Sequence, residues 1–501
     1  MPIAKIHSRA LVGISAPLVT VEAHVTSGLP AFTLVGLPET AVRESRDRVR
    51  AAILSSGFEF PPRRLTVNLA PADLPKDSAR FDLAIAVAIL AATGQLPATA
   101  RERIARIECL GELSLDGSVR SVRGALSAAR AARDDGRDLI LPAEERREAQ
   151  LIPEVRGATV DHLSRLVAFL AGEQVLDPLA HDPPPPADPA VDGDLGDVRG
   201  QPRAKRALAI AAAGSHNLLL VGPPGAGKSM LARRLAGILP PMTEAEALAA
   251  AEVAAVTPAG FRPADFGRRP FRSPHHSASA VALIGGGSQP GPGEISLAHH
   301  GTLFLDELPE FDRRVLEALR EPMESGEVMI SRAARQATFP ADFQLVAAMN
   351  PSPQGTEIHS LAARRYRAKI SGPLLDRIDI HLEVPRVPAA ELDVPDREGE
   401  DSATVRDRVI AARQRMLARQ GTVNGRLDAR GVADHVVLGR NERNMLTGAI
   451  EKLGLSGRAR ERILKLARSI ADYDDRAEID AGALAEAIGY RNMDRMFSGE
   501  N

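Results

Sequence analysis

Gly222-Pro-Pro-Gly-Ala-Gly-Lys228-Ser229 is the stretch that decides the fold, and it stands between an apolar segment, 218–221, and a helical pattern, 230–237. A strand, a glycine loop of the form G-x-x-x-x-G-K-S/T and a helix, in this order, are typical of a phosphate-binding P-loop. The glycines let backbone N–H groups turn inward around phosphates, and the helix N-terminus adds a favourable dipole. The alternative, a glycine-rich turn with a surface lysine, does not explain why the complete motif stands between a strand and a helix. The sequence therefore predicts that this protein binds a nucleoside triphosphate.

The residues of this loop have separate expected roles. Lys228 can reach the β- and γ-phosphates, and the hydroxyl of Ser229 can bind Mg²⁺. The predicted cofactors are therefore ATP and Mg²⁺, with Ser229 as one metal ligand. The residues expected to surround the nucleotide are Gly222, Pro223, Pro224, Gly225, Ala226, Gly227, Lys228 and Ser229.

A second strand-like run, 302–305, ends in Asp306-Glu307. An apolar run that ends in two carboxylates is by itself often no more than a strand end. Here it follows a P-loop within the same α/β pattern, which favours a Walker B segment. Asp306 is then expected to hold Mg²⁺, and Glu307 to polarise the attacking water.

A third run, 343–349, ends in Asn350. Its amide can orient the lytic water or contact the γ-phosphate; the alternative is an asparagine that ends a strand before Pro351. The carboxyl ends of parallel strands meet at one edge of a sheet, so three strand ends are expected to converge on one nucleotide site.

Composition and charge set the broad class. The 501 residues are 44% hydrophobic and 26% charged, which is typical of globular chains, and the length suggests roughly three domains. The formal net charge is −2, so any contact with nucleic acid has to be local. The single cysteine, Cys109, fits a reducing compartment. The start of the chain has no apolar signal core, and no run of about 18 apolar residues occurs, so a cytoplasmic protein without membrane contact is expected.

A proline-rich acidic segment, 177–197, predicts a linker between domains. Residues 1–176 show a self-contained α/β pattern, with strands expected at 31–35 and 65–69 and helices at 82–92 and 124–133. Residues 198–386 form the nucleotide-binding module. Residues 387–501 are predicted to be helical, with helices at 403–420, 442–452, 457–473 and 481–488.

Three stretches, Asn350-Pro351, 372–379 and 456–472, resemble an AAA+ ATPase of the magnesium-chelatase/MCM-like branch. The resemblance implies that Asn350 is sensor 1 and that Arg458 is sensor 2. It also implies that Arg377 is an arginine finger that acts on the ATP of a neighbouring subunit. Without the resemblance, Arg377 is equally well a salt-bridged surface arginine beside Asp376 and Asp379.

The resemblance extends over nearly the whole chain. Segments 200–201, 209–217, 271–277 and 291–301 are similar to the YifB/ComM family of magnesium-chelatase-like bacterial proteins. Segments 73–83, 111–119 and 139–142 look like a Lon-protease-type fold, also called ribosomal S5 domain 2-like.

The expected architecture is therefore a multi-domain α/β protein in three parts. A Lon-like α+β N-terminal domain precedes a central AAA+ P-loop domain and a C-terminal helical lid. The resemblance further implies a homo-oligomer, a hexameric ATP-dependent DNA helicase that promotes branch migration during natural transformation. Its partners would be single-stranded or branched DNA, bound without sequence specificity, and recombination proteins.

Two departures from these families matter. Lon-type proteases need a serine activated by a lysine, and here Arg80 stands at the serine position and Leu126 at the lysine position. Ser78 and Ser127 lie nearby, but no lysine occurs between Lys76 and Lys205, so no peptidase activity is expected. Many relatives carry a Cys-Pro-Cys-Gly-like segment after the sensor asparagine, whereas this chain reads Pro-Ser-Pro-Gln-Gly at 351–355, so a metal role of that loop does not transfer.

Two basic segments are candidates for DNA contact. Residues 327–339 predict a β-hairpin that resembles the pore hairpin of MCM-like motors, with Arg332 in the place of its basic residue and Arg335 beside it. Residues 364–369 hold four cations and an aromatic side chain, a composition that suits phosphate contacts and stacking. For each segment the alternative is a solvated face or a subunit contact. The adjacent His275 and His276 have poor spacing for zinc, and a packing or pore-loop role is expected for them.

Three other functions stay open from sequence. The chain could be a chelatase-type factor that drives insertion of Mg²⁺ into a tetrapyrrole, although the Lon-like domain speaks against this. It could be a protein-remodelling ATPase with an inactive N-terminal docking module. A scaffold without enzyme activity is disfavoured because Lys228, Asp306, Glu307, Asn350 and Arg377 are all present.

Overall fold

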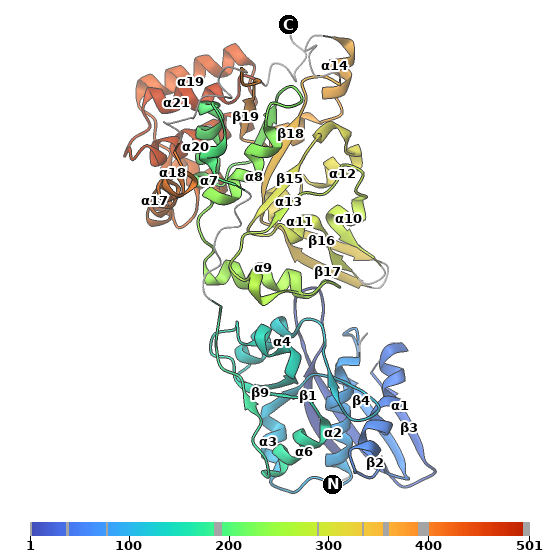
Figure 1. Cartoon of the computed structure of the whole chain (residues 1–501). Coiled ribbons are helices and arrows are strands. Elements are labelled where there is room, and N and C mark those ends of the chain that lie inside the picture. The colour runs from blue at the N-terminus through green and yellow to red at the C-terminus, as the bar shows by residue number, and fades with distance from the viewer. Residues whose placement is uncertain are drawn as a thin grey trace. The chain divides into compact units, whose positions relative to one another are not determined.

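The computed structural model describes residues 3–36, 40–76, 79–184, 193–287, 290–332, 335–353, 360–388 and 400–493, without the side chains of 40–43, 332 and 335. The chain forms two compact units (Figure 1). Unit 1 comprises Met1–Ala187 and Ala251–Phe266, and unit 2 comprises Asp188–Ala250 and Gly267–Asn501.

Unit 1 is built on a mixed eight-stranded sheet in the order β10-β9-β8-β5-β1-β2-β4-β3. The pairs β1/β2, β2/β4 and β9/β10 are antiparallel, and the other neighbours are parallel. Its strands are β1 (Ile3–Arg9), β2 (Leu18–Thr26), β3 (Ala31–Val35), β4 (Arg64–Ala70), β5 (Ile107–Cys109), β8 (Asp138–Pro142), β9 (Gly157–Val160) and β10 (Asp177–Pro178). The segment predicted as a linker thus begins with two residues that pair with β9.

Alternation of side chains explains how this sheet acquires its core. In β2 and β4 every second residue is buried, including Val21 and Val67, so one face of each strand packs inward. The helix α2 (Asp82–Ala92), apolar on all sides after Asp82, packs against β1 and β2. The strands and helices predicted within 1–176 are confirmed, with boundaries that differ by at most one residue.

The remaining elements of unit 1 complete its α/β pattern. They are the helices α1 (Thr40–Ser55), α3 (Ala100–Arg106), α4 (Ala125–Asp134), α5 (Arg146–Ala149) and α6 (Leu163–Ala171) and a hairpin of β6 (Glu112–Leu113) and β7 (Val119–Arg120).

Unit 2 contains a fully parallel five-stranded sheet in the order β12-β15-β18-β11-β19. Its strands are β11 (Leu218–Val221), β12 (Phe271–Arg272), β15 (Thr302–Leu305), β18 (Gln344–Met349) and β19 (Ile380–Glu383). Every residue of β11, β15 and β18 is buried, which is why these strands read as continuous apolar runs rather than as alternating ones. The predicted strands at 218–221, 302–305 and 343–349 are confirmed.

Helices and two hairpins surround this sheet. The helices are α7 (Pro202–Gly214), α8 (Lys228–Ile238), α10 (Ala280–Ile284), α11 (Glu294–Leu297), α12 (Arg313–Ala318), α13 (Pro322–Ser325), α14 (Leu361–Arg367) and α15 (Gly372–Leu375). The helix α9 (Glu244–Ala255) begins in unit 2, and its residues from Ala251 onward belong to unit 1. One hairpin pairs β13 (Gly285–Gly286) with β14 (Gly291–Pro292), and the other pairs β16 (Glu327–Arg332) with β17 (Arg335–Pro340). The second is the hairpin predicted for 327–339.

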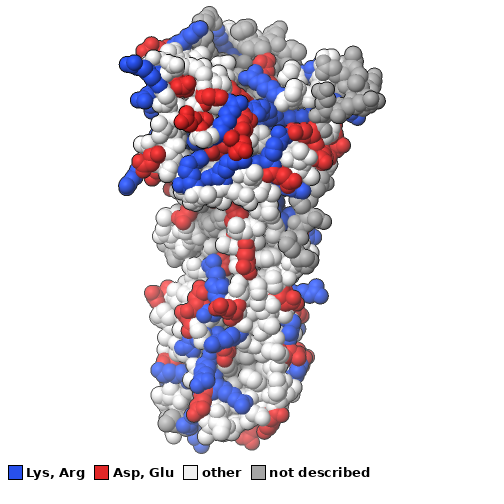
Figure 2. Space-filling model, turned by 90° about the vertical axis from the view of Figure 1, so that its left-hand side faces the viewer, with Lys and Arg blue, Asp and Glu red and all other residues white. Residues whose placement is uncertain are grey.

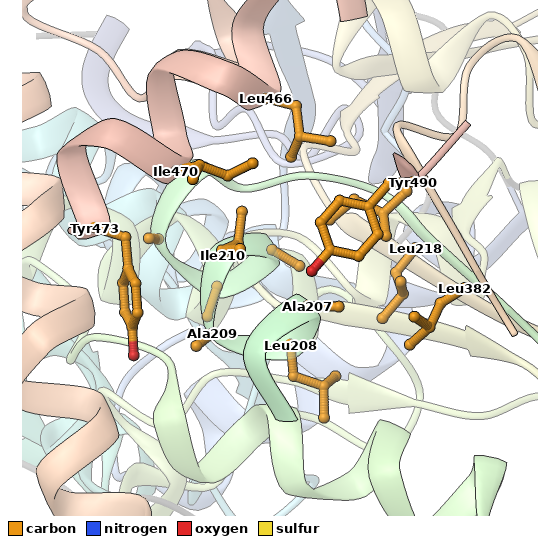
Figure 3. Close-up of a cluster of buried hydrophobic side chains, with 14 of the residues drawn as sticks. Ala207, Leu208, Ala209, Ile210, Leu218, Leu382, Leu466, Ile470, Tyr473 and Tyr490 are labelled. Atoms are coloured by element: carbon orange, nitrogen blue, oxygen red, sulfur yellow. The ribbon is translucent and has the colours of Figure 1, made fainter. Parts of the chain in front are cut away.

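The C-terminal helices share a hydrophobic core with the parallel sheet. Figure 3 shows Leu466 and Ile470 of α20 beside Ile210 of α7, with Leu218 of β11 in the same cluster. These helices are α17 (Ser402–Gln420), α18 (Ala429–His435), α19 (Arg440–Leu453), α20 (Gly457–Tyr473) and α21 (Ala481–Gly489). The four predicted helices are confirmed to within two residues at each end. Within the described residues, no helix is both long and apolar enough to span a bilayer.

Candidate nucleotide-binding site

The P-loop connects β11 to α8, as the sequence predicts. Gly222 donates its N–H to the carbonyl of Met349 (3.2 Å), which ties the loop to the end of β18. A Cβ atom at Gly222 would lie 2.1 Å from the carbonyl oxygen of Val384, so only glycine allows this approach. Gly227 has a φ of 88°, a left-handed conformation that favours glycine, immediately before the first residue of α8.

Lys228 joins the P-loop to Asn350, the residue after β18. Its side chain is 8% exposed, and Nζ donates to the carbonyls of Gly222 (2.8 Å) and Pro223 (3.0 Å) and to Oδ1 of Asn350 (3.1 Å). Burial lowers the pKa of Lys228, while the charges of Asp306 and Glu307 oppose this shift.

Ser229 joins the P-loop to Asp306, the residue after β15. Its hydroxyl donates to Oδ2 of Asp306 at 2.6 Å. A hydroxyl and a carboxylate in contact are the hard oxygen ligands that Mg²⁺ prefers, so the residues present fit this metal. Elsewhere in the described parts of the chain, no cluster of three or more His, Cys, Asp or Glu side chains suits a metal ion.

Glu307 has an unusual backbone and an unexpected neighbour. Its φ of 52° is left-handed for a residue with a side chain, and the side chain is 52% exposed. His276 brings Nδ1 to 3.4 Å from Oε2 of Glu307, and its ring lies 4.1 Å from that of His275. From the sequence, a packing or pore-loop role is expected for these histidines. Their contact with Glu307 is not predicted, because His276 follows β12 whereas Glu307 follows β15.

The three strand ends therefore converge, as predicted. The contacts Lys228–Asn350 and Ser229–Asp306 link the carboxyl ends of β11, β18 and β15 at one edge of the sheet. This is the crevice where open parallel sheets bind ligands.

Arg377 is a buried arginine that forms an ion pair within its own subunit. Its side chain is 7% exposed, and Nη2 lies 2.6 Å from Oε1 of Glu324 on α13. The pairing with Asp376 or Asp379 is wrong, because Asp379 binds Arg462 at 2.7 Å and Asp376 lies 4.0 Å from Arg491. The other expected sensor, Arg458, is exposed in the first turn of α20.

The two candidate DNA-contact residues close one hairpin. Arg332 and Arg335 are paired in register at the end of β16 and β17, but their side chains lie outside the described part of the structure. Below them, Ile330 packs closely on Gly285, so this hairpin contacts the β13–β14 hairpin. On the face drawn in Figure 2, cations and anions are interspersed in both units, as a net charge of −2 suggests.

Two cations of the basic segment 364–369, Arg367 and Lys369, bind groups within the same subunit. Arg367 is buried and donates to the carbonyl of Pro351 (3.1 Å). Lys369 lies 3.3 Å from Glu310 and 5.5 Å from the ring centroid of Tyr366. The sequence shows no carboxylate near this segment, and the fold supplies one from a distant position. Arg365 remains at the surface and, with Lys369, lines a cavity of about 440 Å³.

The described positions that align with a Lon-type serine and lysine are buried. Arg80 is 3% exposed and donates to the main-chain carbonyls of Arg9 and Arg123. Leu126 is completely buried, and Ser127 Oγ is buried without a hydrogen-bond partner in the structure. Ser78 lies outside the described residues.

Lys76, the last lysine before the long lysine-free stretch, is also buried in unit 1. Its Nζ donates to the carbonyl of Pro71. Burial lowers the pKa of Lys76, and the charge of Asp73 opposes the shift.

Three family models match this chain. Residues 194–392 match the magnesium chelatase, subunit ChlI model; 21–145 match the model for subunit ChlI of Mg-chelatase; and 399–491 match the ChlI C-terminal model.

Full-length relatives are also found. The uncharacterized protein YifB of Salmonella typhimurium is 50% identical over 503 residues, which cover 99% of this chain and 98% of that protein. The competence protein ComM of Haemophilus influenzae is 48% identical over 506 residues, 99% of each chain. The magnesium-chelatase 67 kDa subunit of Chlorobaculum tepidum is 27% identical over 168 residues, 31% of this chain and 23% of that protein. With its P-loop sheet and these full-length relatives, the chain belongs to the YifB/ComM family of magnesium-chelatase-like proteins.

Proposed function

We propose that unit 2 hydrolyses ATP with Mg²⁺. The observation that carries the proposal is the pair of contacts Lys228–Asn350 and Ser229–Asp306, which bring three strand ends to one P-loop. Ser229 and Asp306 would hold the metal, which when bound neutralises charge on the transferred phosphoryl group.

Each residue of the site would have one role in hydrolysis. Lys228 exchanges the carbonyls of Gly222 and Pro223 for the β- and γ-phosphates. The amide of Asn350 contacts the γ-phosphate or orients the attacking water, and Glu307 accepts a proton from that water. To do so, the carboxylate of Glu307 has to turn from His276 toward the phosphate.

The active form is proposed to be a homo-oligomeric ring, most simply a hexamer. Arg377 would act on the ATP of the neighbouring subunit and Arg458 as sensor 2, as the family resemblance implies. A head-to-tail contact of this kind closes into a ring when its rotation allows.

The ring is proposed to translocate on single-stranded or branched DNA in the cytoplasm and to drive branch migration when transforming DNA is integrated, together with recombination proteins. Support comes from the 48% identity with the competence protein ComM over 99% of the chain. Arg332 and Arg335 would contact the DNA backbone, with 364–369 as a further contact to DNA or to a neighbouring subunit. Unit 1 would be a docking module without peptidase activity, since Arg80 and Leu126 stand where a dyad would need serine and lysine.

A remodelling ATPase is the second candidate, favoured by the matches to magnesium-chelatase models. The rate of ATP hydrolysis, measured with forked, single-stranded and four-way DNA and without DNA, separates the two. Stimulation by DNA supports the translocating motor. An ATPase rate that ignores all three DNA substrates would favour remodelling.

A further inference from the structure

The guanidinium of Arg377 is held inside its own subunit. Nη2 lies 2.6 Å from Oε1 of Glu324, and Nη1 donates to the carbonyl of Pro373 at 2.7 Å. Nε is buried and has no hydrogen-bond partner among the residues that the structure describes. An arginine that is to contact a phosphate on another chain cannot do so while a carboxylate occupies the same donors.

The backbone at Arg377 is fixed, so only its side chain is free to exchange partners. Asn217 donates Nδ2 to the carbonyl of Arg377 at 3.1 Å and accepts the N–H of Leu345 at 2.8 Å. Asp379, two residues further on, accepts the N–H of Asn217 at 2.8 Å. These buried contacts anchor the segment to β11 and β18.

Space for the exchange lies next to the pair. A cavity of about 500 Å³ is lined by Glu317, Arg320, Glu321, Glu324, Ser325 and Arg377. Glu324 is 52% exposed at this cavity, so water can solvate its carboxylate when Arg377 leaves, whereas the 7%-exposed guanidinium leaves only for another anion. Glu317 is already bound to Arg320 at 2.7 Å.

We propose that Glu324 is a positioning residue that stores Arg377 until a phosphate of the nucleotide on a second copy of this chain replaces its carboxylate. Three carboxylates and two guanidinium groups line the cavity, so it does not attract a free anion. Only a phosphate delivered by a docked neighbour displaces Glu324. This inference rests on the proposed function of Arg377.

The test uses two inactive full-length proteins that complement each other. Lys228→Ala protein lacks a working nucleotide site but keeps Arg377, whereas Arg377→Ala protein keeps the site. In an equal mixture, activity arises where an Arg377 faces an intact site. Adding Glu324→Gln to the Lys228→Ala protein frees the stored arginine, and the restored ATPase rate should rise roughly threefold to tenfold. Because only the arginine donor changes, kcat should rise while KM for ATP stays the same.

Two controls locate the effect. Glu324→Gln placed instead in the Arg377→Ala protein should leave the mixed rate unchanged, because that chain has no arginine to store. Glu321→Gln, at the same cavity and without an ion pair among the described residues, should also leave the rate unchanged in either protein.

The outcomes separate the two proposals. If the plain mixture of Lys228→Ala and Arg377→Ala proteins regains no activity, the role of Arg377 on a neighbouring site is wrong. If activity returns but Glu324→Gln in the arginine donor leaves it equal or lowers it, Glu324 does not store Arg377, and the inference alone is overturned.

Discussion

At the scale of single residues, the proposed nucleotide site contains side chains that the sequence identifies and neighbours that it does not. Asp306 and Glu307 follow an apolar run, and that order predicts both carboxylates. The contact between Glu307 and His276 depends instead on β12 and β15 lying side by side in the sheet. Sequence patterns report neighbours along one helix or strand, whereas the pairing of two strands brings together residues that no local pattern connects.

The first prediction separates nucleotide binding from turnover. Glu307→Gln should bind ATP normally and lose hydrolysis by a factor of about 10² or more, because the amide cannot accept the proton of water. Lys228→Ala should weaken ATP binding itself, since it removes the charge that faces the phosphates. Titration with a fluorescent ATP analogue and a steady-state phosphate-release assay measure the two effects. Hydrolysis by Glu307→Gln at a near-normal rate would remove the assigned role of this carboxylate.

At the scale of elements, α20 is joined to the residue before β19 by an ion pair whose carboxylate is buried. Asp379 is 2% exposed; Oδ1 lies 2.7 Å from Nη1 of Arg462 on α20, and Oδ2 lies 3.6 Å from Nδ1 of His216. Burial alone would raise the pKa of Asp379, but the charge of Arg462, which also donates a hydrogen bond to it, outweighs burial and holds that pKa well below its usual range.

Sequence periodicity predicts the helix 457–473 but not this pair. Apolar residues at three-to-four spacing predict which face of α20 is buried. Arg462 is only half-buried on this helix, and its place is set by a carboxylate from another element rather than by the apolar spacing.

The second prediction follows from this pair. Asp379→Asn should lower the free energy of unfolding of unit 2 by about 3 kcal/mol at pH 7, since it leaves Arg462 without its buried partner. The folded pKa of Asp379 is depressed, so the stabilisation is complete above the unfolded value of about 3.9 and is lost as the pH falls further toward the folded value. The difference between the two proteins in urea unfolding should therefore be complete at pH 7 and should shrink progressively as the pH falls below about 4. The exposed Glu451→Gln, which removes a surface carboxylate of the same unit, serves as the control. An equal difference at every pH would contradict the assignment.

The third prediction concerns the β16–β17 hairpin and its proposed contact with DNA. Arg332→Ala should leave basal ATPase and assembly intact, reduce stimulation by DNA and stop strand displacement. DNA binding should weaken equally on all sequences, and the slope of log K against log salt should fall by about one unit for one lost phosphate contact. Gly326 alone separates this hairpin from α13, which carries Glu324, so DNA bound at the hairpin would lie close in sequence to the helix proposed to store Arg377.

The matched control for this prediction is Gln336→Ala, an uncharged exposed position on the same hairpin, which should unwind DNA like the wild type. If Arg332→Ala protein also displaces strands at the normal rate, the hairpin has a structural role and the DNA path lies elsewhere.

At the scale of the whole molecule, the sequence predicts two α/β regions and a helical C-terminal region, and contacts divide the chain into two units. The C-terminal helices were expected as a lid of their own, and their core is continuous with that of the sheet through α7 and α20. The sequence of a helix that is apolar on most sides, such as α7, predicts that the helix is buried. It does not predict which elements cover the helix, because these elements come from distant parts of the chain.

The last prediction uses probes that the chain itself places in separate units. Cys109 is the single cysteine, lies in unit 1 and is completely buried; burial, with the charge of Glu108, raises the pKa of its thiol. The three tyrosines, Tyr366, Tyr473 and Tyr490, are all buried in unit 2, and the chain has no tryptophan. Thiol labelling during urea unfolding therefore reports unit 1, and near-UV circular dichroism of tyrosine reports unit 2.

Mg²⁺ and ATP at about 100 times Kd should stabilise the unit that binds them by about 2.7 kcal/mol. In the Glu307→Gln background, which prevents turnover, the tyrosine transition should move to higher urea while Cys109 labelling stays in place. In Lys228→Ala protein neither transition should move at these concentrations. If nucleotide shifts both probes together, the two units unfold as one cooperative body, and the division of the chain into two independently stable units is wrong.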